Sequence, residues 1–445
     1  MANFDYDVII AGGGGAGLTA AYRLGSAGYS VLIVEKEIRM GGRTLSGQAG
    51  NAYPFNLGTQ FFVGDVGPLA DLRKELGING RFTTMAPLGV FMAGKLAVTR
   101  SNFDMLRQLP ISLAAKISLA FNMLKFQTQA RKFYKPGWIS RNGQRMRELD
   151  RQCYSEAIQD IHAEALPFFR LLAGDLCANQ PEDVSSIGGM VSTIALAFGD
   201  CFVGEEGNES LHKAMLQLSG ADTVNGAEVK AMRSYPDHVE LTFYHEGGER
   251  TATAKYMVSA LPADVVLSTV PDLDPAKRAA LGNVIYGPYI TGVFITCEEG
   301  DARWRRLPMM VSFDTAFGFV VNQSFAFYGE GKGKPGSVIF GMAFTENAKA
   351  LMEKEEEEIR QIYRADMLKI FPEMETVLKE VIIQKWTHGL PGFRPGAYGE
   401  TSLRKEPHGR IYFAGDYTAD INGSLRVAVI SAEECAAAII RELGE

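Results

Sequence analysis

The chain has 445 residues with 46% apolar content and a formal net charge of -7. This length allows a large buried core and favours a soluble globular protein of two domains, and the acidic balance argues against a nucleic-acid partner. Five cysteines without CxxC spacing and six histidines without ligand spacing fit a reducing cytosol and predict neither disulfides nor a metal site.

The N-terminal letters "MANFDYDVII" lead directly into an apolar strand, without the basic region and apolar run that mark a secretory signal. The longest uncharged stretch, 279–297, is interrupted by Asn283, Gly287 and Pro288, so we interpret it as buried strand and turn. We therefore expect a cytoplasmic protein without a membrane-spanning helix.

Residues 7–37, "DVIIAGGGGAGLTAAYRLGSAGYSVLIVEKE", predict a strand, a glycine-marked turn, a helix and a second strand that ends at an acid. Gly12 suits the tight turn, Gly14 allows the backbone to approach a pyrophosphate, and Gly17 allows the helix to pack closely on the strand. The helix start stabilises a pyrophosphate through its free N–H groups and its dipole. Glu35 is positioned to accept hydrogen bonds from an adenosine ribose. The pattern predicts a dinucleotide site.

The letters "MGGRT" at 40–44 narrow the choice of dinucleotide. Two glycines permit another close backbone approach, and the guanidinium of Arg43 is a fixed fork suited to phosphate oxygens. With these residues the sequence resembles the superfamily of flavin amine oxidases, protoporphyrinogen oxidases and carotenoid (phytoene) desaturases. Its N-terminal signature is a GxGxxG βαβ unit, a Glu, and then Gly-Gly-Arg-[Ser/Thr]. The resemblance implies FAD and a two-domain fold, with an α/β FAD-binding Rossmann-like domain and an α+β substrate domain.

A second part of the resemblance lies near the C-terminus, at "IYFAGDYT" (411–418) and the helix that follows it. In the family a strand ending in Ala-Gly-[Asp/Glu] returns to the cofactor, which implies that Asp416 binds the ribityl chain. Backbone N–H groups near Ser424 and Leu425 would then offset negative charge on the reduced isoalloxazine. Arg426 stands where the family commonly has Glu, and two interpretations stay open: it raises the flavin's reduction potential, or it points to solvent.

A third segment, 220–266, predicts a strand, a hairpin that turns at "EGGE", and a further strand that ends in Ala-Leu-Pro. The resemblance implies a backbone contact from Val229 to the adenine, with a plain core valine as the alternative. The predicted cofactor contacts are Gly12, Gly14, Gly15, Ala16, Gly17, Glu35, Lys36, Gly42, Arg43, Gly58, Thr59, Val229, Ala260, Gly415, Asp416, Ser424 and Leu425.

These segments predict how the two domains divide the chain. The FAD-binding domain is expected to be discontinuous. Its segments are 1–75, 198–275 and 385–445. The substrate domain is expected to take the intervening residues, 76–197 and 276–384.

Residues 101–147 have an unusual charge balance, with nine basic side chains and one acid in a chain that is acidic overall. The letters "PISLAAKISLAFNMLKF" predict a helix with one apolar face. The face consists of Leu113, Ile117, Ala120, Phe121 and Leu124. Two interpretations stay open. The face packs in the core of the substrate domain, or the helix lies on an anionic membrane surface as a basic amphipathic helix.

The segment "WTHGLPGFRPGAYGE" (386–400) carries the predicted substrate wall. The resemblance places Trp386 beside the flavin and Tyr398 at one of the two facing aromatics of amine oxidases. The residue before that Tyr is a covalent flavin cysteine in some members and is Ala397 here, so non-covalent FAD is expected. His388 is interpreted as a structural histidine.

Other positions depart from the amine oxidase pattern. Thr291 stands where those enzymes have a Lys that holds a water, and Ser424 falls near the place of the second aromatic. The letters "AGDYT" also resemble plant-type phytoene desaturases, which act on lipophilic substrates at membranes. The segment "FNLGTQFF" (55–62) is expected near the flavin, with Gln60 as a polar contact.

Together these residues favour an FAD-dependent oxidoreductase that abstracts a hydride from a C–H bond of a fairly apolar substrate, as in desaturase-like or protoporphyrinogen-oxidase-like dehydrogenation. The predicted catalytic positions are Tyr398, Trp386, Thr291 and Gln60. The first alternative is a flavin amine oxidase that produces an imine and peroxide. The second is an FAD-free lipid- or prenyl-binding protein on the same fold, against which the intact glycine motif and Asp416 argue. The oligomeric state and the electron acceptor stay open.

Overall fold

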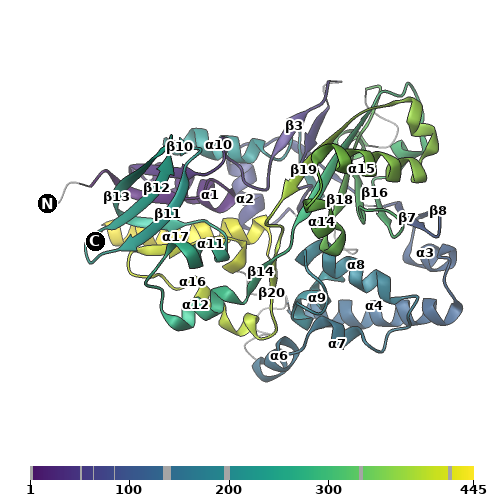
Figure 1. Cartoon of the computed structure of the whole chain (residues 1–445), viewed down its shortest axis with the longest axis horizontal. Coiled ribbons are helices and arrows are strands. Elements are labelled where there is room, and N and C mark those ends of the chain that lie inside the picture. The colour runs from purple at the N-terminus through teal and green to yellow at the C-terminus, as the bar shows by residue number, and fades with distance from the viewer. Residues whose placement is uncertain are drawn as a thin grey trace.

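The computed structural model describes residues 4–50, 53–63, 65–84, 86–133, 142–194, 201–329, 334–418 and 423–444. Two seven-stranded sheets form its centre, and Figure 1 shows them side by side, with a group of helices beneath the second. Among the described residues, no helix combines the length and apolar character that crossing a membrane requires.

The first sheet has the strand order β10-β2-β1-β13-β12-β11, and β21 also pairs with β13. Its parallel part joins β10, β2, β1, β13 and β21, whereas β11, β12 and β13 form an antiparallel meander. The predicted hairpin at "EGGE" is confirmed. The strands are β1 (Tyr6–Ala11), β2 (Val31–Glu35), β10 (Asp222–Asn225), β11 (Glu228–Ser234), β12 (Val239–His245), β13 (Gly248–Ser259) and β21 (Ile411–Phe413).

Helices cover the first sheet and bring both chain ends together. Helix α1 (Gly15–Ser26) packs against α17 (Leu425–Gly444) and α10 (Ser210–Ser219). Residues Val8 to Ala11 are fully buried because layers lie on both faces of the parallel part. As a result, the helix starts of α1 and α17 meet at the carboxyl edge of the sheet, where parallel α/β sheets bind their ligands.

The second sheet has the order β19-β15-β18-β17-β16-β7-β8 and is antiparallel except where β7 pairs with β16. All eight residues of its strand β15 are buried, because α15 (Glu356–Ile370) covers this sheet. The strands are β7 (Leu88–Met92), β8 (Lys95–Thr99), β15 (Tyr289–Thr296), β16 (Met309–Ser312), β17 (Phe319–Asn322), β18 (Val338–Ala343) and β19 (Leu378–Trp386).

Three small sheets are also present: β14 with β20, β3 with β4, and β9 between β5 and β6. Their strands are β3 (Ser46–Gln48), β4 (Pro54–Asn56), β5 (Phe62–Val63), β6 (Gly80–Thr83), β9 (Cys201–Gly204), β14 (Val284–Tyr286) and β20 (Pro391–Phe393). Single 3₁₀ turns are formed by Arg303–Arg306, Pro372–Thr376, Ala397–Glu400 and Asp416–Thr418.

The helices beneath the second sheet come from the first segment predicted for the substrate domain, and they share an apolar core. They are α3 (Asn102–Gln108), α4 (Leu113–Phe133), α6 (Gly143–Asp150), α7 (Tyr154–Ile158), α8 (Leu166–Cys177) and α9 (Ser186–Ser192). The remaining helices are α2 (Pro68–Glu75), α11 (Ala263–Thr269), α12 (Pro275–Gly282), α13 (Gln323–Tyr328), α14 (Thr345–Met352) and α16 (Thr401–Lys405). The exact domain boundaries stay a prediction.

Candidate cofactor and substrate site

The glycine turn between β1 and α1 is built by close backbone contacts. Gly12 has a φ of +103°, and a Cβ there would lie 2.9 Å from the carbonyl oxygen of Ala260. A Cβ on Gly17 would lie 1.9 Å from the carbonyl oxygen of Gly12, so helix and strand touch at this point. Gly14 differs, because its nearest neighbour would be the Cα of Gly42 at 3.9 Å. Two glycines therefore allow packing, and Gly14 faces open space.

The second glycine loop lies against the first. Gly41 and Gly42 have φ values of +125° and +54°, which L-residues with side chains rarely adopt. The N–H of Gly41 donates to the carbonyl of Gly13 at 2.9 Å. The two loops thus form a cradle of backbone groups that lacks side chains.

Glu35 ends β2 beneath this cradle. Its carboxylate accepts hydrogen bonds from the N–H of Gly13 at 2.6 Å and of Glu37 at 3.0 Å. It therefore fixes the glycine turn in addition to the ribose contact predicted for it. Lys36 is exposed and lies 3.8 Å from the Glu37 carboxylate. Val229 lies in a buried cluster of β11, as the plain core alternative expects, and its contact with adenine stays a prediction.

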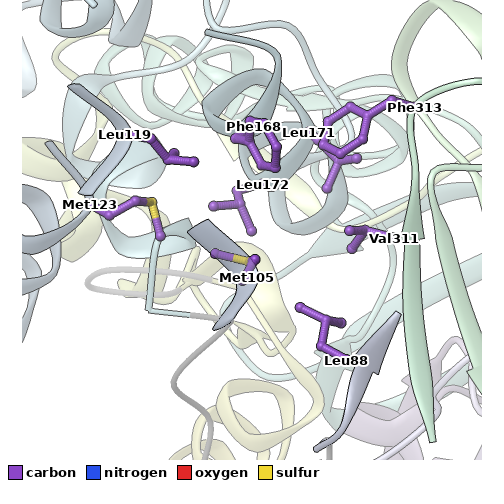
Figure 2. A pocket seen from close by; sticks show the side chains of 9 residues that line it. All are labelled: Leu88, Met105, Leu119, Met123, Phe168, Leu171, Leu172, Val311 and Phe313. Carbon is purple, nitrogen blue, oxygen red and sulfur yellow. The ribbon is translucent and has the colours of Figure 1, made fainter. Parts of the chain in front are cut away.

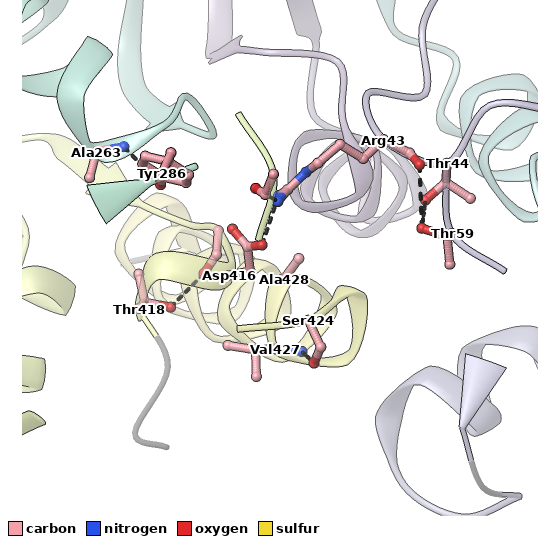
Figure 3. A network of polar contacts seen from close by, with 12 residues as sticks. Arg43, Thr44, Thr59, Ala263, Tyr286, Asp416, Thr418, Ser424, Val427 and Ala428 are labelled. Atoms are coloured by element: carbon pink, nitrogen blue, oxygen red, sulfur yellow. Dashed lines mark hydrogen bonds and ion pairs between the residues drawn. The ribbon is translucent and has the colours of Figure 1, made fainter. Parts of the chain in front are cut away.

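Arg43 and Asp416 join the two ends of the chain (Figure 3). One guanidinium nitrogen donates to the Asp416 carboxylate at 2.7 Å, and another donates to the carbonyl of Gly389 at 2.6 Å. The Asp416 side chain is 6% exposed and the Arg43 side chain 37%. Burial lowers the pKa of Arg43, but attraction to Asp416 outweighs this and raises it, so the guanidinium stays charged. Asp416 is thus the buried half of an ion pair, and Arg43 keeps an open side.

Tyr286 stands behind this pair and was missed by sequence reasoning. Its hydroxyl accepts a hydrogen bond from the N–H of Ala263 at 3.2 Å (Figure 3). Burial, followed by the charge of Asp416, raises the pKa of Tyr286 far above its usual range, so the phenol is neutral. Tyr286 is therefore an uncharged neighbour of the Arg43–Asp416 ion pair.

Helix α17 begins at the predicted place. The hydroxyl of Ser424 accepts from the N–H of Val427 at 3.4 Å and caps the helix (Figure 3). The N–H groups of Leu425 and Arg426 have no partner among the residues that the structure describes. A Cβ on Gly15 would lie 2.4 Å from the side chain of Leu425, which shows how closely the two helix starts approach. Arg426 is exposed and lies beside Gly67 on the surface, which favours the solvent interpretation of this residue.

The segment predicted to lie near the flavin, 55–62, runs beside Arg43. A Cβ on Gly58 would lie 2.0 Å from the carbonyl oxygen of Arg43, and the N–H of Thr59 donates to that oxygen at 3.0 Å. Gln60 is held through its amide, which donates to the carbonyl of Gly58 at 2.8 Å and accepts from Gln323 at 2.7 Å. Gln323 was not predicted, because nothing local in its sequence marks it.

Trp386 and Thr291 meet at the end of the second sheet. The indole N–H donates to the Thr291 hydroxyl at 3.1 Å, and that hydroxyl donates to the carbonyl of Leu57 at 2.8 Å. The indole also reaches Gly58, whose Cβ would lie 3.4 Å from the ring. Three of the predicted positions, Trp386, Thr291 and Gly58, are therefore brought together.

Tyr398 lies against different elements. Its ring is 5.0 Å from that of Phe393, and its hydroxyl would lie 3.0 Å from a Cβ on Gly188 of α9. Its place in an aromatic cage stays a prediction. His388 pairs with Asp264 at 2.8 Å at the surface, which fits the structural role expected for it.

Residues 16–440 match the family model described as flavin containing amine oxidoreductase. The chain belongs to this family. Its members use FAD as the cofactor of an oxidoreductase, so cofactor and enzyme class follow as the sequence predicts. Membership also favours an enzyme over the FAD-free binding protein.

Solved structures confirm the two-domain fold predicted for the family. Putrescine oxidase bound to putrescine superimposes with a TM-score of 0.77 at 18% identity, covering 98% of this chain and 99% of that chain. Cyclohexylamine oxidase from Brevibacterium oxydans superimposes with a TM-score of 0.80 at 18% identity, covering 99% of this chain and all of that chain.

Similarity to characterised sequences is local. A "Probable flavin-containing monoamine oxidase A" from Dictyostelium discoideum is 44% identical over 73 residues, 16% of this chain and 16% of that protein. Nicotine dehydrogenase from Pseudomonas putida is 54% identical over 43 residues, 10% of this chain and 9% of that protein. These matches span less than a fifth of the relatives' own length.

The residues of this flavoenzyme fit FAD in both charge and shape. The side-chain-free cradle at Gly14 and Gly42 fits a pyrophosphate, and Arg43, next to Gly42 in the chain, carries the positive charge predicted for it. His212 of α10 is buried against this cradle, with Nε2 3.3 Å from the Cβ position of Gly15. Burial lowers the pKa of His212 to about 4, so it is neutral at pH 7 and adds no charge. Arg43 stays the cation that the sequence predicts for the diphosphate.

Asp175 of α8 is the most informative residue that sequence reasoning missed. It shares one helix face with Leu171 and Ala178, and that face packs against Tyr289, whose hydroxyl donates to the Asp175 backbone carbonyl at 2.7 Å. No cation pairs with the Asp175 carboxylate in the part of the chain that the structure describes. Burial raises its pKa to about 7. The available signal was an isolated acid in the otherwise apolar "LLAGDLC".

Proposed function

We propose that the protein oxidises an amine whose positive charge is received by Asp175. Family membership supports amine oxidation over the desaturase-like alternative favoured by sequence alone, and the two fold neighbours are named for amine substrates. The observation that carries the proposal is the unpaired carboxylate in the substrate domain. Asp175 is only partly exposed, and an ammonium group would supply the partner that its carboxylate lacks among the described residues.

Asp175 lies within electrostatic reach of the cofactor cradle through Tyr289. Burial raises the pKa of Tyr289 well above its usual range, the charge of Asp175 raises it further, and the charge of Arg43 lowers it. Tyr289 is therefore close to both charges, and it is paired across the sheet with Trp386. Trp386 and the two residues that flank Asp175 on its helix face, Leu171 and Ala178, belong to one apolar cluster with Tyr289.

The chain's own residues would bind and orient the amine. Asp175 holds the charged nitrogen, the indole of Trp386 is fixed by Thr291, and the apolar cluster of Tyr289 and Phe344 excludes water. Bound FAD would supply the redox chemistry as hydride acceptor for the carbon beside an amine nitrogen that has first lost its proton to solvent, and an iminium ion would be left. The Thr291 hydroxyl donates its single proton to the carbonyl of Leu57 and accepts from the indole of Trp386, so unlike a Lys it has no further proton to donate to a water.

Anaerobic mixing of the FAD-loaded protein with amines tests the proposal. We expect putrescine or cyclohexylamine, used as probes, to bleach the flavin absorbance. Added oxygen or a quinone then identifies the electron acceptor by the rate at which the oxidised spectrum returns. A flavin that no amine bleaches, but that a polyene or a porphyrinogen reduces, would establish the desaturase-like alternative instead.

Asp175→Asn is expected to weaken amine binding and to stabilise the fold. The KM for a cationic amine should rise about tenfold or more, because a charge-assisted partner worth roughly 1.5–3 kcal/mol is lost, while kcat changes less. Steady-state kinetics over a range of amine concentrations separates the two constants. Asp160→Asn, at an exposed acid in the same domain, is the matched control and should change neither.

Stability should respond to Asp175→Asn in a pH-dependent way. Because its pKa is raised, folded Asp175 binds a proton between about pH 4 and 7 that the unfolded chain has released. The wild type therefore loses stability as pH rises through this window, and the amide variant lacks that loss. Thermal unfolding should show the variant more stable above pH 7 and equal near pH 4. A constant difference between the two proteins across this range would contradict the assignment.

A further inference from the structure

The outer face of α4 is apolar and open to solvent. Its four large side chains, which we call the α4 apolar face, are Leu113 (73% exposed), Ile117 (62%), Phe121 (66%) and Leu124 (66%). The interpretation that this face packs in the core is therefore wrong. The opposite face of α4 packs in the core, and its buried residues are Ala115, Leu119, Phe126, Ala130 and Phe133.

The inner side of α4 packs in the core without contributions from the α4 apolar face. Leu119 and Met123 point toward α8 and the second sheet, where they border a small apolar cavity of about 20 Å³ (Figure 2). With the inner face packed, four large apolar side chains remain on the surface along about 16 Å of helix. Exposed apolar patches of this kind mark sites of interaction rather than sites of packing.

Basic residues flank the α4 apolar face. Lys125 and Lys132 leave the helix on one side of the face and Lys116 on the other, at helical angles of about 70–90° from its centre. The Lys116 ammonium donates to the carbonyl of Arg107, and that of Lys125 lies over the ring of Phe126. Lys125, Arg131 and Lys132 are exposed. Glu164 is the acid at the N-terminal end of α4, where its carboxylate accepts from the N–H of Ser112. The face is thus an apolar strip bordered by cations.

We propose that the α4 apolar face docks on an anionic bilayer surface. A helix lying in the membrane interface buries such a strip among the acyl chains and places flanking lysines at the phosphate level. Charge complementarity selects this occupant, because residues 101–147 carry nine basic side chains and one acid in a chain of net charge -7. A second copy of the chain would bring the same lysines face to face, which like-charge repulsion opposes.

In this docking mode the first sheet and its helices would stay away from the membrane. Figure 1 shows α4 in the helical group away from the first sheet, with α3 near one end of it. Phe103 of α3, 78% exposed, adds a further apolar side chain near that end. Docking through α4 would hold the substrate domain at the membrane and leave the cofactor domain in water.

Vesicle flotation with the FAD-loaded protein tests the proposal independently of any catalytic activity. Wild type should float with phosphatidylserine-rich vesicles, remain in solution with pure phosphatidylcholine, and be released by high salt. The double variant Ile117→Gln with Phe121→Gln should bind phosphatidylserine-rich vesicles at least about tenfold more weakly, because two large apolar side chains no longer enter the bilayer. Lys125→Gln with Lys132→Gln should weaken binding to anionic vesicles alone.

Leu218→Gln, at an exposed leucine of α10, is the matched control and should float as wild type does. An unchanged flavin spectrum and thermal midpoint establish that each variant is folded. Wild type that binds both vesicle types equally, or neither, overturns the proposal. So does binding that survives the Ile117→Gln and Phe121→Gln pair. A dimer in sedimentation equilibrium that Phe121→Gln dissociates would assign the face to a second copy of the chain instead.

Discussion

Arg43→Ala is expected to give a protein that folds but emerges from gel filtration without FAD. The change removes the open cation of the cradle and leaves the buried Asp416 carboxylate without its partner. Removing one member of a buried pair costs roughly 3–5 kcal/mol, and the partly exposed position of Arg43 places this case near the lower end. That cost falls on the stability of the fold. FAD itself would lose a charge-assisted contact worth roughly 1.5–3 kcal/mol, so we expect its Kd to rise by about one to two orders of magnitude, measured by titrating apoprotein and following flavin fluorescence.

Two further variants separate binding from folding in this prediction. Arg43→Lys keeps a positive charge but loses the fork that reaches both Asp416 and the carbonyl of Gly389, so it should bind FAD with intermediate affinity. Asp416→Asn in the Arg43→Ala background removes the orphaned charge. It should recover thermal stability without recovering FAD. If Arg43→Ala protein retains its yellow colour through gel filtration, the guanidinium has no part in holding the cofactor.

Local backbone requirements explain why the cofactor end could be predicted. Gly17 is needed because the carbonyl oxygen of Gly12, which is close in sequence, lies 1.9 Å from where its Cβ would be. Gly12 is needed for its φ of +103°, and its own close contact, at 2.9 Å, is with the distant Ala260. The Gly-Asp step at Asp416 is similarly short and specific. Short motifs of this kind can be recognised in the sequence because a fixed local backbone geometry requires them.

The substrate side could not be predicted because its contacts are long-range and lack a fixed spacing. Asp175 meets Tyr289 across more than a hundred residues, and Gln60 meets Gln323 across more than two hundred and fifty. For the same reason, the sequence could not predict which apolar side of α4 is buried and which is exposed. Periodicity shows that one helix side is apolar, but α4 is apolar on two sides, and only tertiary packing decides which one the core takes.

Gly17→Ala and Gly14→Ala are expected to fail in different ways, although each adds one methyl group to the same turn. The new Cβ at position 17 would lie 1.9 Å from the backbone carbonyl of Gly12 and 3.2 Å from Ile10. Neither the carbonyl nor the buried strand can withdraw, so α1 must separate from β1. The cost should be about 3 kcal/mol or more, a large part of the 5–15 kcal/mol that stabilises a typical domain. We expect insoluble protein or a strongly lowered thermal midpoint, with and without added FAD.

At position 14 the methyl group meets no protein atom closer than the Cα of Gly42 at 3.9 Å, and the backbone φ of -82° suits alanine. The apoprotein should therefore fold with a nearly unchanged thermal midpoint. The methyl group projects into the cradle between the two glycine loops, so FAD should bind at least about a hundredfold more weakly. Calorimetry of both apoproteins and FAD titration of the soluble one distinguish these outcomes. Gly14→Ala protein that binds FAD as wild type does would move the pyrophosphate away from this cradle, whereas the failure of Gly17→Ala to fold would remain a matter of packing alone.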